Sequence, residues 1–325
     1  MSYNLGHVHA WNNNIWQLLK SYISKDRVPS ALLLSGVAGL GKLDLALRFA
    51  SLLLCHKPQN NEPCMACVRC KLLENESHID LIRVAAIDSN VIKIEQIRDL
   101  TDKLMTSASD AIYKIAIIED ADCMQEKASN ALLKTLEEPR GRTILILLSS
   151  KVAQLPITIR SRCSHIPMKA PSKHDLKPHL AEQNIDIDLF YSYCRGAPLS
   201  VLDSIHDDTI TEIFATMKRS CVFMENSLPE LLSKLQNFAS YEVVKVSLLM
   251  LQDILKYMTF RGSVETFVLT QSDLAKINFN NMIIYKLYKF YDHHIKLLKE
   301  IDSQVVWQHK AIVVDLYNNW YKIRS

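Results

Sequence analysis

Four cysteines are the residues of this chain whose type and spacing most directly indicate chemistry. Cys55 is followed by Cys64-x-x-Cys67-x-x-Cys70. Four thiolates complete a tetrahedral zinc site, and two-residue spacers let neighbouring sulfurs converge on one ion. Because such a site has no open position, the pattern predicts a structural Zn²⁺ that orders the polar segment 57–63. The alternative is four reduced cysteines that bind no metal.

A glycine-rich segment shortly before the cysteines reads Gly36-x-x-Gly39-x-Gly41-Lys42, after a predicted strand and at the start of a predicted helix. In a phosphate-binding loop, glycine N–H groups turn towards phosphates and the helix N-terminus adds partial positive charge. Lys42 would reach the outer phosphates. The next residue is Leu43, where Ser or Thr would supply a Mg²⁺ ligand. The segment therefore predicts a vestigial nucleotide site without ATP hydrolysis or Mg²⁺-ATP binding; the alternative is a turn that meets no nucleotide.

An acidic pair, Glu119 and Asp120, follows the apolar run 115–118. Active ATPases of this kind usually place Asp first, to hold the metal's water, and Glu second, as the base. With the order reversed, both carboxylates would be misplaced by about one methylene, and catalytic geometry tolerates little misplacement. The pair therefore agrees with a nucleotide site that has lost its chemistry, although a solvated strand end is the simpler alternative.

Arg162 lies in the segment Leu155–Cys163, which we expect to be a strand that carries basic groups at its end. An arginine near a domain edge can reach across a subunit interface to a neighbour's ATP and accelerate hydrolysis roughly a thousand-fold or more. Its planar guanidinium suits phosphate oxygens better than an ammonium does. The alternative is an ordinary solvated arginine.

The elements that must position these residues alternate between apolar runs of strand length and helical patterns. The predicted strands are 31–34, 81–84, 114–118 and 143–148, and the predicted helices are 43–54, 94–105 and 127–136. Alternation of this kind predicts a parallel sheet with helices on both faces. Trp11 and Trp16 precede the first strand, and we expect both in the core.

Prolines mark a boundary after Met168, and Ser172 is a plausible N-cap for the helix that follows. Beyond residue 208 the pattern is helical only. We therefore expect an α/β domain at 1–168 with the cysteine insert at about 55–79, a small helical domain at 169–208 and an all-helical domain at 209–325. The chain of 325 residues is 48% hydrophobic and 22% charged with a formal charge of +3, which is ordinary for a globular protein. The sequence contains no run long enough to span a bilayer and no secretory pattern, so we expect a cytoplasmic protein without a membrane partner.

In order along the chain, the glycine-rich loop, the four cysteines, the segment 130–139 (NALLKTLEEP) and Ser161-Arg162-Cys163 resemble bacterial clamp-loader subunits of the AAA+ class. Leu43 narrows the resemblance to the delta-prime subunits of DNA polymerase III, because the gamma/tau motor subunits keep the hydroxyl and a cleaner Asp-Glu pair. The motifs cover about residues 27–168. The rest matches in layout only, as a lid followed by a collar.

The resemblance implies a rigid, non-hydrolysing member of a hetero-pentamer with the gamma/tau motor subunits and the delta subunit. That assembly opens the sliding clamp around primed DNA as part of the DNA polymerase III holoenzyme. It implies that Arg162 faces the ATP of the adjacent motor subunit and that the four cysteines hold zinc. It also implies a lost lid arginine, since Leu199 follows Gly196-Ala197-Pro198.

Two other functions fit parts of the sequence. Lys42 and the two acids would suit a motor-type clamp-loader ATPase of the gamma/tau kind. The cysteines would suit a separate zinc-containing nucleic-acid-binding protein, but the segment 57–70 has few basic residues and no aromatic residue for stacking.

Overall fold

The computed structural model describes residues 8–86, 91–106, 108, 111–181, 187–194, 196–200, 209–223, 225–260, 266, 268–277, 279, 283–302 and 308–324. The chain divides into two compact units, Met1–Leu176 and Lys177–Ser325. The further division into a lid at 169–208 and a collar at 209–325 stays a prediction, because residues 201–208 lie outside the described ranges. In the described part of the chain, no helix is long and apolar enough to span a membrane.

The first unit contains a five-stranded sheet in the order β2-β3-β4-β1-β5, with every pairing parallel. Its strands are β1 (Ala31–Ser35), β2 (Leu81–Val84), β3 (Lys114–Ile118), β4 (Thr143–Ser149) and β5 (Ser164–Pro167). The first four confirm the predicted strands. The apolar pattern did not predict β5, because it is a short edge strand in which only Ile166 is buried.

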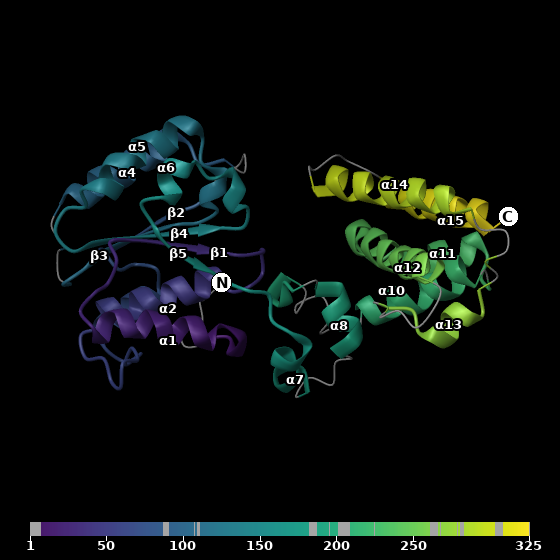
Figure 1. The fold of residues 1–325 in the computed structure, drawn as a ribbon, viewed down its shortest axis with the longest axis horizontal. Helices are drawn as coiled ribbons and strands as arrows, with labels where there is room; N and C mark the ends of the chain where they lie inside the picture. Colours follow the sequence, from purple (N-terminus) through teal and green to yellow (C-terminus); the bar gives the residue numbers. More distant parts are fainter. Residues whose placement is uncertain are drawn as a thin grey trace. The chain divides into compact units, whose positions relative to one another are not determined.

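Helices cover both faces of this sheet, as predicted (Figure 1). They are α1 (Asn13–Ser24), α2 (Lys42–Leu54), α3 (Val68–Glu74), α4 (Ile94–Met105), α5 (Glu126–Glu137) and α6 (Ile157–Arg160). Side chains alternate along each strand, so Leu32 and Leu34 of β1 pack in the core with α1 and α2. Leu33 packs in the other core, with α4 and α5.

The expected strand at Leu155–Cys163 is wrong. Residues 157–160 form the short helix α6, and a turn at residues 161–162 then leads into β5. Pro156 precedes the helix, where its fixed φ is compatible with a first turn. Ile159 is fully buried against the face that holds α4 and α5, while Ile157 is exposed, which is a helical and not a strand pattern.

The second unit is helical throughout its described residues. Its elements are α8 (Ile187–Cys194), α10 (Thr209–Met217), a π-helical turn (Lys218–Val222), α11 (Leu228–Leu235), α12 (Ser240–Phe260), α13 (Gln271–Ala275), α14 (Ile284–Asp302) and α15 (His309–Arg324). The helix α7 (Lys173–Ala181) begins at the end of the first unit. Ser172 precedes α7 and exchanges hydrogen bonds with Asp175, so the predicted cap is confirmed. In the region beyond residue 208, predicted to be helical, residues 224, 261–265, 267, 278, 280–282, 303–307 and 325 lie outside the described ranges.

A buried polar group joins α12, α14 and α15 in the second unit. Ser247 Oγ lies 2.7 Å from His294 Nε2 and accepts a hydrogen bond from Trp320 Nε1 at 2.8 Å. His294 Nδ1 lies 2.7 Å from the carbonyl oxygen of Phe290. An Nδ1–H tautomer satisfies every atom, with Ser247 donating to Nε2. Protonation would give Nε2 a hydrogen where it now accepts one, and burial lowers the pKa of His294 to about 4.

This histidine predicts a loss of stability in mild acid. Between pH 6.5 and 4, the unfolded chain binds a proton at residue 294 that the folded chain does not bind. The free energy of unfolding of the second unit should therefore fall by roughly 3 kcal/mol as pH decreases through this window, and the contribution is fully present above it. Urea unfolding at pH 7 and pH 4.5 measures the change in a variant in which Trp11, Trp16 and Trp307 are replaced by Phe, so that the fluorescence comes from Trp320 alone. An equally steep pH dependence in His294→Gln would contradict the assignment.

Candidate functional site

The phosphate loop connects the carboxyl end of β1 to the N-terminus of α2. Gly39 and Gly41 have φ values of 77° and 79°, which L side chains rarely adopt. A Cβ on Gly36 would lie 2.6 Å from the carbonyl oxygen of Met168, so a larger residue does not fit there. The glycines are thus required by backbone conformation at two positions and by space at the third, as a phosphate loop demands.

Lys42 is buried in this loop, with its side chain turned back over it. Nζ donates hydrogen bonds to the carbonyl oxygens of Gly36 and Val37 at 2.8 and 2.9 Å, and to Ser150 Oγ at 3.1 Å. Burial lowers the pKa of Lys42, and the nearby carboxylates of Asp120 and Asp122 partly oppose the effect. The ammonium is thus positioned inside the loop, where it would contact a phosphate that replaced the carbonyl oxygens.

The side chain after the lysine contributes to packing. Leu43 is half-buried and packs against the core that contains α1 and α2. A hydroxyl at this position would be a magnesium ligand, but an isobutyl group offers no lone pair. The loop therefore retains its shape and its lysine but lacks this ligand for Mg²⁺.

The acidic residues after β3 make two separate sets of contacts. Glu119 Oε1 accepts hydrogen bonds from Arg83 Nε and Nη2 at 2.9 and 2.7 Å, and the same guanidinium lies 3.2 Å from Glu76. Asp122 Oδ1 accepts the backbone N–H of Ser150 at 3.0 Å. Asp120 adopts a left-handed conformation, with φ of 45°. The carboxylates that act on Lys42 are therefore those of Asp120 and Asp122, while Glu119 forms an ion pair with Arg83 of β2.

Sequence reasoning named Glu119 and Asp120 and gave no role to Asp122 or Arg83. Asp122 is two residues beyond Asp120 in the same acidic stretch, so the stretch itself was the available signal. Arg83 had no sequence signal, because a lone arginine in a strand does not show which carboxylate it contacts. Its contact follows from the pairing of β2 with β3, in which Arg83 is opposite Ile117.

The segment before α1 covers the same loop. His9 Nε2 lies 2.9 Å from Asp44 in the first turn of α2, and the ring stacks on Trp11 with centroids 4.7 Å apart. Trp11 Nε1 and Asn12 Nδ2 both donate to the carbonyl oxygen of Leu40. Trp11 is half-buried, whereas Trp16 is only 3% exposed and confirms the expectation of a core residue.

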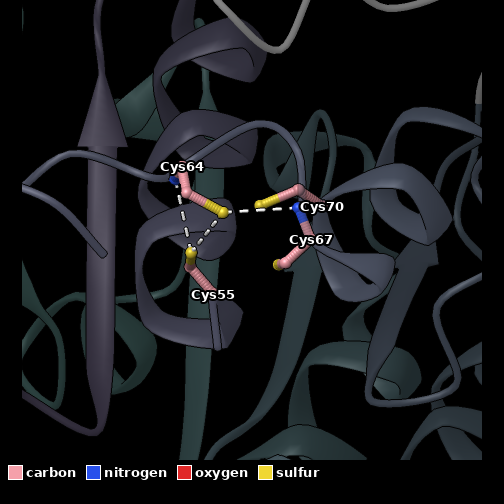
Figure 2. Close-up of side chains that lie close together, drawn as sticks. All are labelled: Cys55, Cys64, Cys67 and Cys70. Carbon is pink, nitrogen blue, oxygen red and sulfur yellow. Dashed lines mark hydrogen bonds between the residues drawn. The ribbon is translucent and has the colours of Figure 1, made fainter. Parts of the chain in front are cut away.

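The four predicted cysteines lie together, as Figure 2 shows. Their sulfur atoms are all within 4.8 Å of one another, and Cys55 Sγ is 3.5 Å from Cys64 Sγ. Backbone N–H groups of Cys64 and Cys67 donate to the sulfurs of Cys55 and Cys64, at 3.3 and 3.4 Å. Four sulfurs that bind one Zn²⁺ tetrahedrally, with Zn–S bonds of about 2.3 Å, must lie as close to one another as these four do. The donor set therefore fits a single Zn²⁺ ion.

Two local turns bring the cysteines into position. Asn60 and Asn61 both have positive φ and form a tight hairpin turn, in which residues 59 and 62 exchange backbone hydrogen bonds of 2.9 and 2.8 Å. Met65, between Cys64 and Cys67, has φ of 54°. This bend lets Cys67 lie beside Cys64 before α3 begins.

Glu62 holds the hairpin against the rest of the unit. Its carboxylate accepts hydrogen bonds from Trp16 at 2.7 Å, Lys20 at 3.0 Å and Arg48 at 2.9 Å. Burial alone would raise the pKa of Glu62, but these three donors outweigh it and lower the pKa. The cysteine insert is therefore attached to α1 and α2 by a charged contact that sequence reasoning did not predict.

Arg162 lies in the turn between α6 and β5. Its Nε and Nη2 donate to one carboxylate oxygen of Glu137, and Nη1 donates to the carbonyl oxygen of Thr158 at 2.9 Å. About a third of its side chain is exposed. Glu137 belongs to the segment 130–139, so the structure brings two of the sequence motifs into contact. The guanidinium has a defined orientation at the surface of the first unit.

Comparison with known proteins gives matches that cover between about half and two thirds of the chain. A family model described as "DNA polymerase III, delta subunit" matches residues 11–172. A DNA polymerase III subunit delta' from Pseudomonas aeruginosa is 35% identical over 211 residues, which are 63% of this chain and 63% of that protein. A DNA polymerase III subunit tau from Bacillus subtilis is 36% identical over 210 residues, which are 65% of this chain and 36% of that protein. The matched stretches thus span less than two thirds of either relative.

The fold of the whole chain is similar to a solved structure as well. A DNA polymerase III gamma subunit-related protein from Thermotoga maritima superposes with a TM-score of 0.51 over 95% of this chain and 99% of that chain, at 15% identity. With the phosphate loop, the parallel sheet and the helical second unit, these matches identify the fold as that of the AAA+ class. Over residues 11–172 the chain therefore belongs to the family described as DNA polymerase III, delta subunit, and it is a relative of the delta-prime subunits of DNA polymerase III.

Proposed function

We propose that this chain is a delta-prime-type subunit of a bacterial replicative clamp loader, which does not hydrolyse ATP and supplies Arg162 to the ATP site of a neighbouring motor subunit. The single observation that carries the proposal is Leu43. Identity alone does not separate the two kinds of subunit, since relatives named delta' and tau match about equally well. A phosphate loop whose ligand position for magnesium is a half-buried leucine supports the non-hydrolysing kind.

The partners proposed for the chain are gamma/tau motor subunits and a delta subunit, assembled as a hetero-pentamer in the cytoplasm. The complex would act on a sliding clamp and primed DNA. The names of the relatives support the association with DNA polymerase III components. Within the complex, the second unit would form the collar that joins the subunits.

The cysteine cluster is proposed to hold structural Zn²⁺ through Cys55, Cys64, Cys67 and Cys70. The ion would supply cross-linking of the insert and no chemistry, because four thiolates leave no open position. The mutual distances of the sulfurs and the N–H donors around them support this role. Glu62 would then hold the ordered insert against α1 and α2.

A motor-type ATPase is the second candidate, and the position of Lys42 favours it. Its ammonium lies inside the loop near Asp120 and Asp122, an arrangement that suits a metal-nucleotide complex. The two candidates differ in what the purified chain does with ATP. They are therefore separated by one measurement.

The isolated chain should not turn over ATP in the presence of Mg²⁺. Phosphate release at saturating ATP should equal the rate of a Lys42→Ala variant, because the wild-type loop lacks a magnesium ligand. Leu43→Thr restores that ligand and shows whether the hydroxyl is the only missing part. Turnover by the wild-type chain that the Lys42→Ala variant abolishes would favour the motor-type ATPase.

A further inference from the structure

A basic hollow lies at the amino-terminal ends of β3 and β4. The phosphate loop follows the carboxyl-terminal end of β1, so the hollow is at the opposite end of the parallel strands. Two adjoining cavities of about 390 and 160 Å³ share Met105, Arg140 and Thr143 in their walls. The larger volume is within the range of small-molecule sites. The walls come from the end of α4, the first residues of β3 and β4, and the loop between α5 and β4.

Cations outnumber anions around this hollow. Among the described residues, its walls contain Lys114, Lys134, Arg140 and Arg142 and one carboxylate, Glu138. Within the described part of the chain, none of the four cations forms an ion pair. Surface lysines and arginines are often solvated, so an excess of positive charge does not by itself indicate a binding site. It does so here because one of the four cations is buried.

Lys114 is that buried cation, with 7% of the residue exposed. Its ammonium donates to Thr106 Oγ1 at 2.5 Å and to the carbonyl oxygen of Thr106 at 3.2 Å. A buried charge is normally paired, because desolvation without an opposite charge is costly. Among described residues, Lys114 has neutral oxygens only, and it opens onto the larger cavity.

The loop that carries the arginines has a defined shape. Gly141 has φ of 57°, and a Cβ there would meet nothing within 4 Å, so the glycine serves the backbone turn and not the space. The turn brings the two arginines to the same cavity wall, and the guanidinium of Arg142 lies 5.7 Å from the ring centroid of Tyr113. Arginine held in this way is suited to bidentate contact with phosphate oxygens.

We infer that this hollow at the amino-terminal ends of β3 and β4 binds a small ligand with clustered phosphate groups, such as a di- or triphosphate. The inference rests on the cavity, the buried ammonium and the two arginines taken together. Thr101, Thr106 and Thr143 also line the walls, but their hydroxyls donate to backbone carbonyl oxygens, so the cations would supply the contacts to the phosphate oxygens. The site is separate from the phosphate loop, and its existence does not depend on the role of Arg162. Nucleic-acid backbone offers the same phosphate chemistry, and the experiment must separate the two sources.

The test is calorimetric titration of the full chain with inorganic tripolyphosphate at low salt. Arg140→Gln/Arg142→Gln should lower the affinity roughly ten-fold or more, since two charge-assisted contacts are lost. Because the phosphate loop could bind the same probe, the arginine and control variants are compared in a Lys42→Ala background, in which binding at the hollow should persist. Lys296→Gln/Lys299→Gln is the matched control, which removes two positive charges from α14 and should also have no effect.

Several outcomes would overturn the inference. They are the absence of tripolyphosphate binding, its loss in Lys42→Ala, and an equal loss in the α14 control. Asp110 lies outside the described residues, and binding that appears only in Asp110→Asn would mean that this carboxylate already satisfies the lysine. A double arginine variant that weakens binding of single-stranded oligothymidine but not of tripolyphosphate would identify a nucleic-acid surface instead.

Discussion

Replacing Arg162 with alanine is expected to lower ATP hydrolysis at the adjoining motor subunit about a thousand-fold while the complex still assembles. The guanidinium would neutralise charge on the phosphoryl group in the transition state, and alanine leaves that charge without a partner. The side chain is partly exposed and its contacts are confined to α5 and α6, so its removal should not disturb the fold. Single-turnover hydrolysis by the reconstituted complex, with size-exclusion chromatography for assembly, measures both effects.

Two variants sharpen this experiment. Arg162→Lys keeps the charge but loses the planar fork, so it should recover only part of the rate. Lys169→Ala removes an exposed cation beyond the opposite end of β5 and should have no effect. An unchanged rate in Arg162→Ala would show that the arginine has no part in the neighbour's chemistry.

Removal of the metal is expected to have the second large effect. Structural zinc contributes roughly 10 kcal/mol or more of apparent binding free energy to the small units that it orders. The residues from Cys55 to Ile79 include only one short helix and bury few side chains, so this insert should lose its order without the ion. The two sheet faces have separate cores, and the rest of the first unit should stay folded.

Zinc content and proteolysis together test this expectation. Wild-type chain should contain one zinc per molecule, and Cys67→Ser should lose it and become sensitive to protease between residues 55 and 79. Cys123→Ser is the matched control, because that thiol lies outside the cluster and the variant should retain its metal. Stoichiometric zinc in Cys67→Ser, or an insert that resists protease after chelation, would show that these thiols do not order the insert through a metal.

Arg83 links the cysteine insert to the residues beside the phosphate loop through two ion pairs. Arg83 contacts Glu76, which follows α3, and Glu119, which follows β3. The side chains of Arg83 and Glu119 are about four-fifths buried, where such pairs are screened less than at the surface. The end of the cysteine insert is therefore connected to the acidic stretch beside the phosphate loop by one guanidinium.

The amino-acid sequence was sufficient to predict those parts of this protein that depend on local pattern. Short apolar runs identified four of the five strands. Of these, β1, β3 and β4 are buried along their whole length, as parallel strands covered on both faces are, whereas β2 contains Arg83 and only Val84 is fully buried. The glycines of the phosphate loop and the spacing of the cysteines could be read directly, since backbone conformation and ligand convergence restrict residue type over a few positions. The absent hydroxyl at Leu43 was equally visible.

Contacts between residues that are distant in the sequence could be identified only from the folded chain. The helix at 157–160 was missed because its sequence, Ile-Thr-Ile-Arg, does not distinguish a strand from a single helical turn. The pairing of Glu119 with Arg83, the contact of Arg162 with Glu137 and the attachment of Glu62 to Trp16 and Arg48 all join segments that are well separated in the chain. Strand order and helix packing set these contacts, and no local pattern in the sequence contains them.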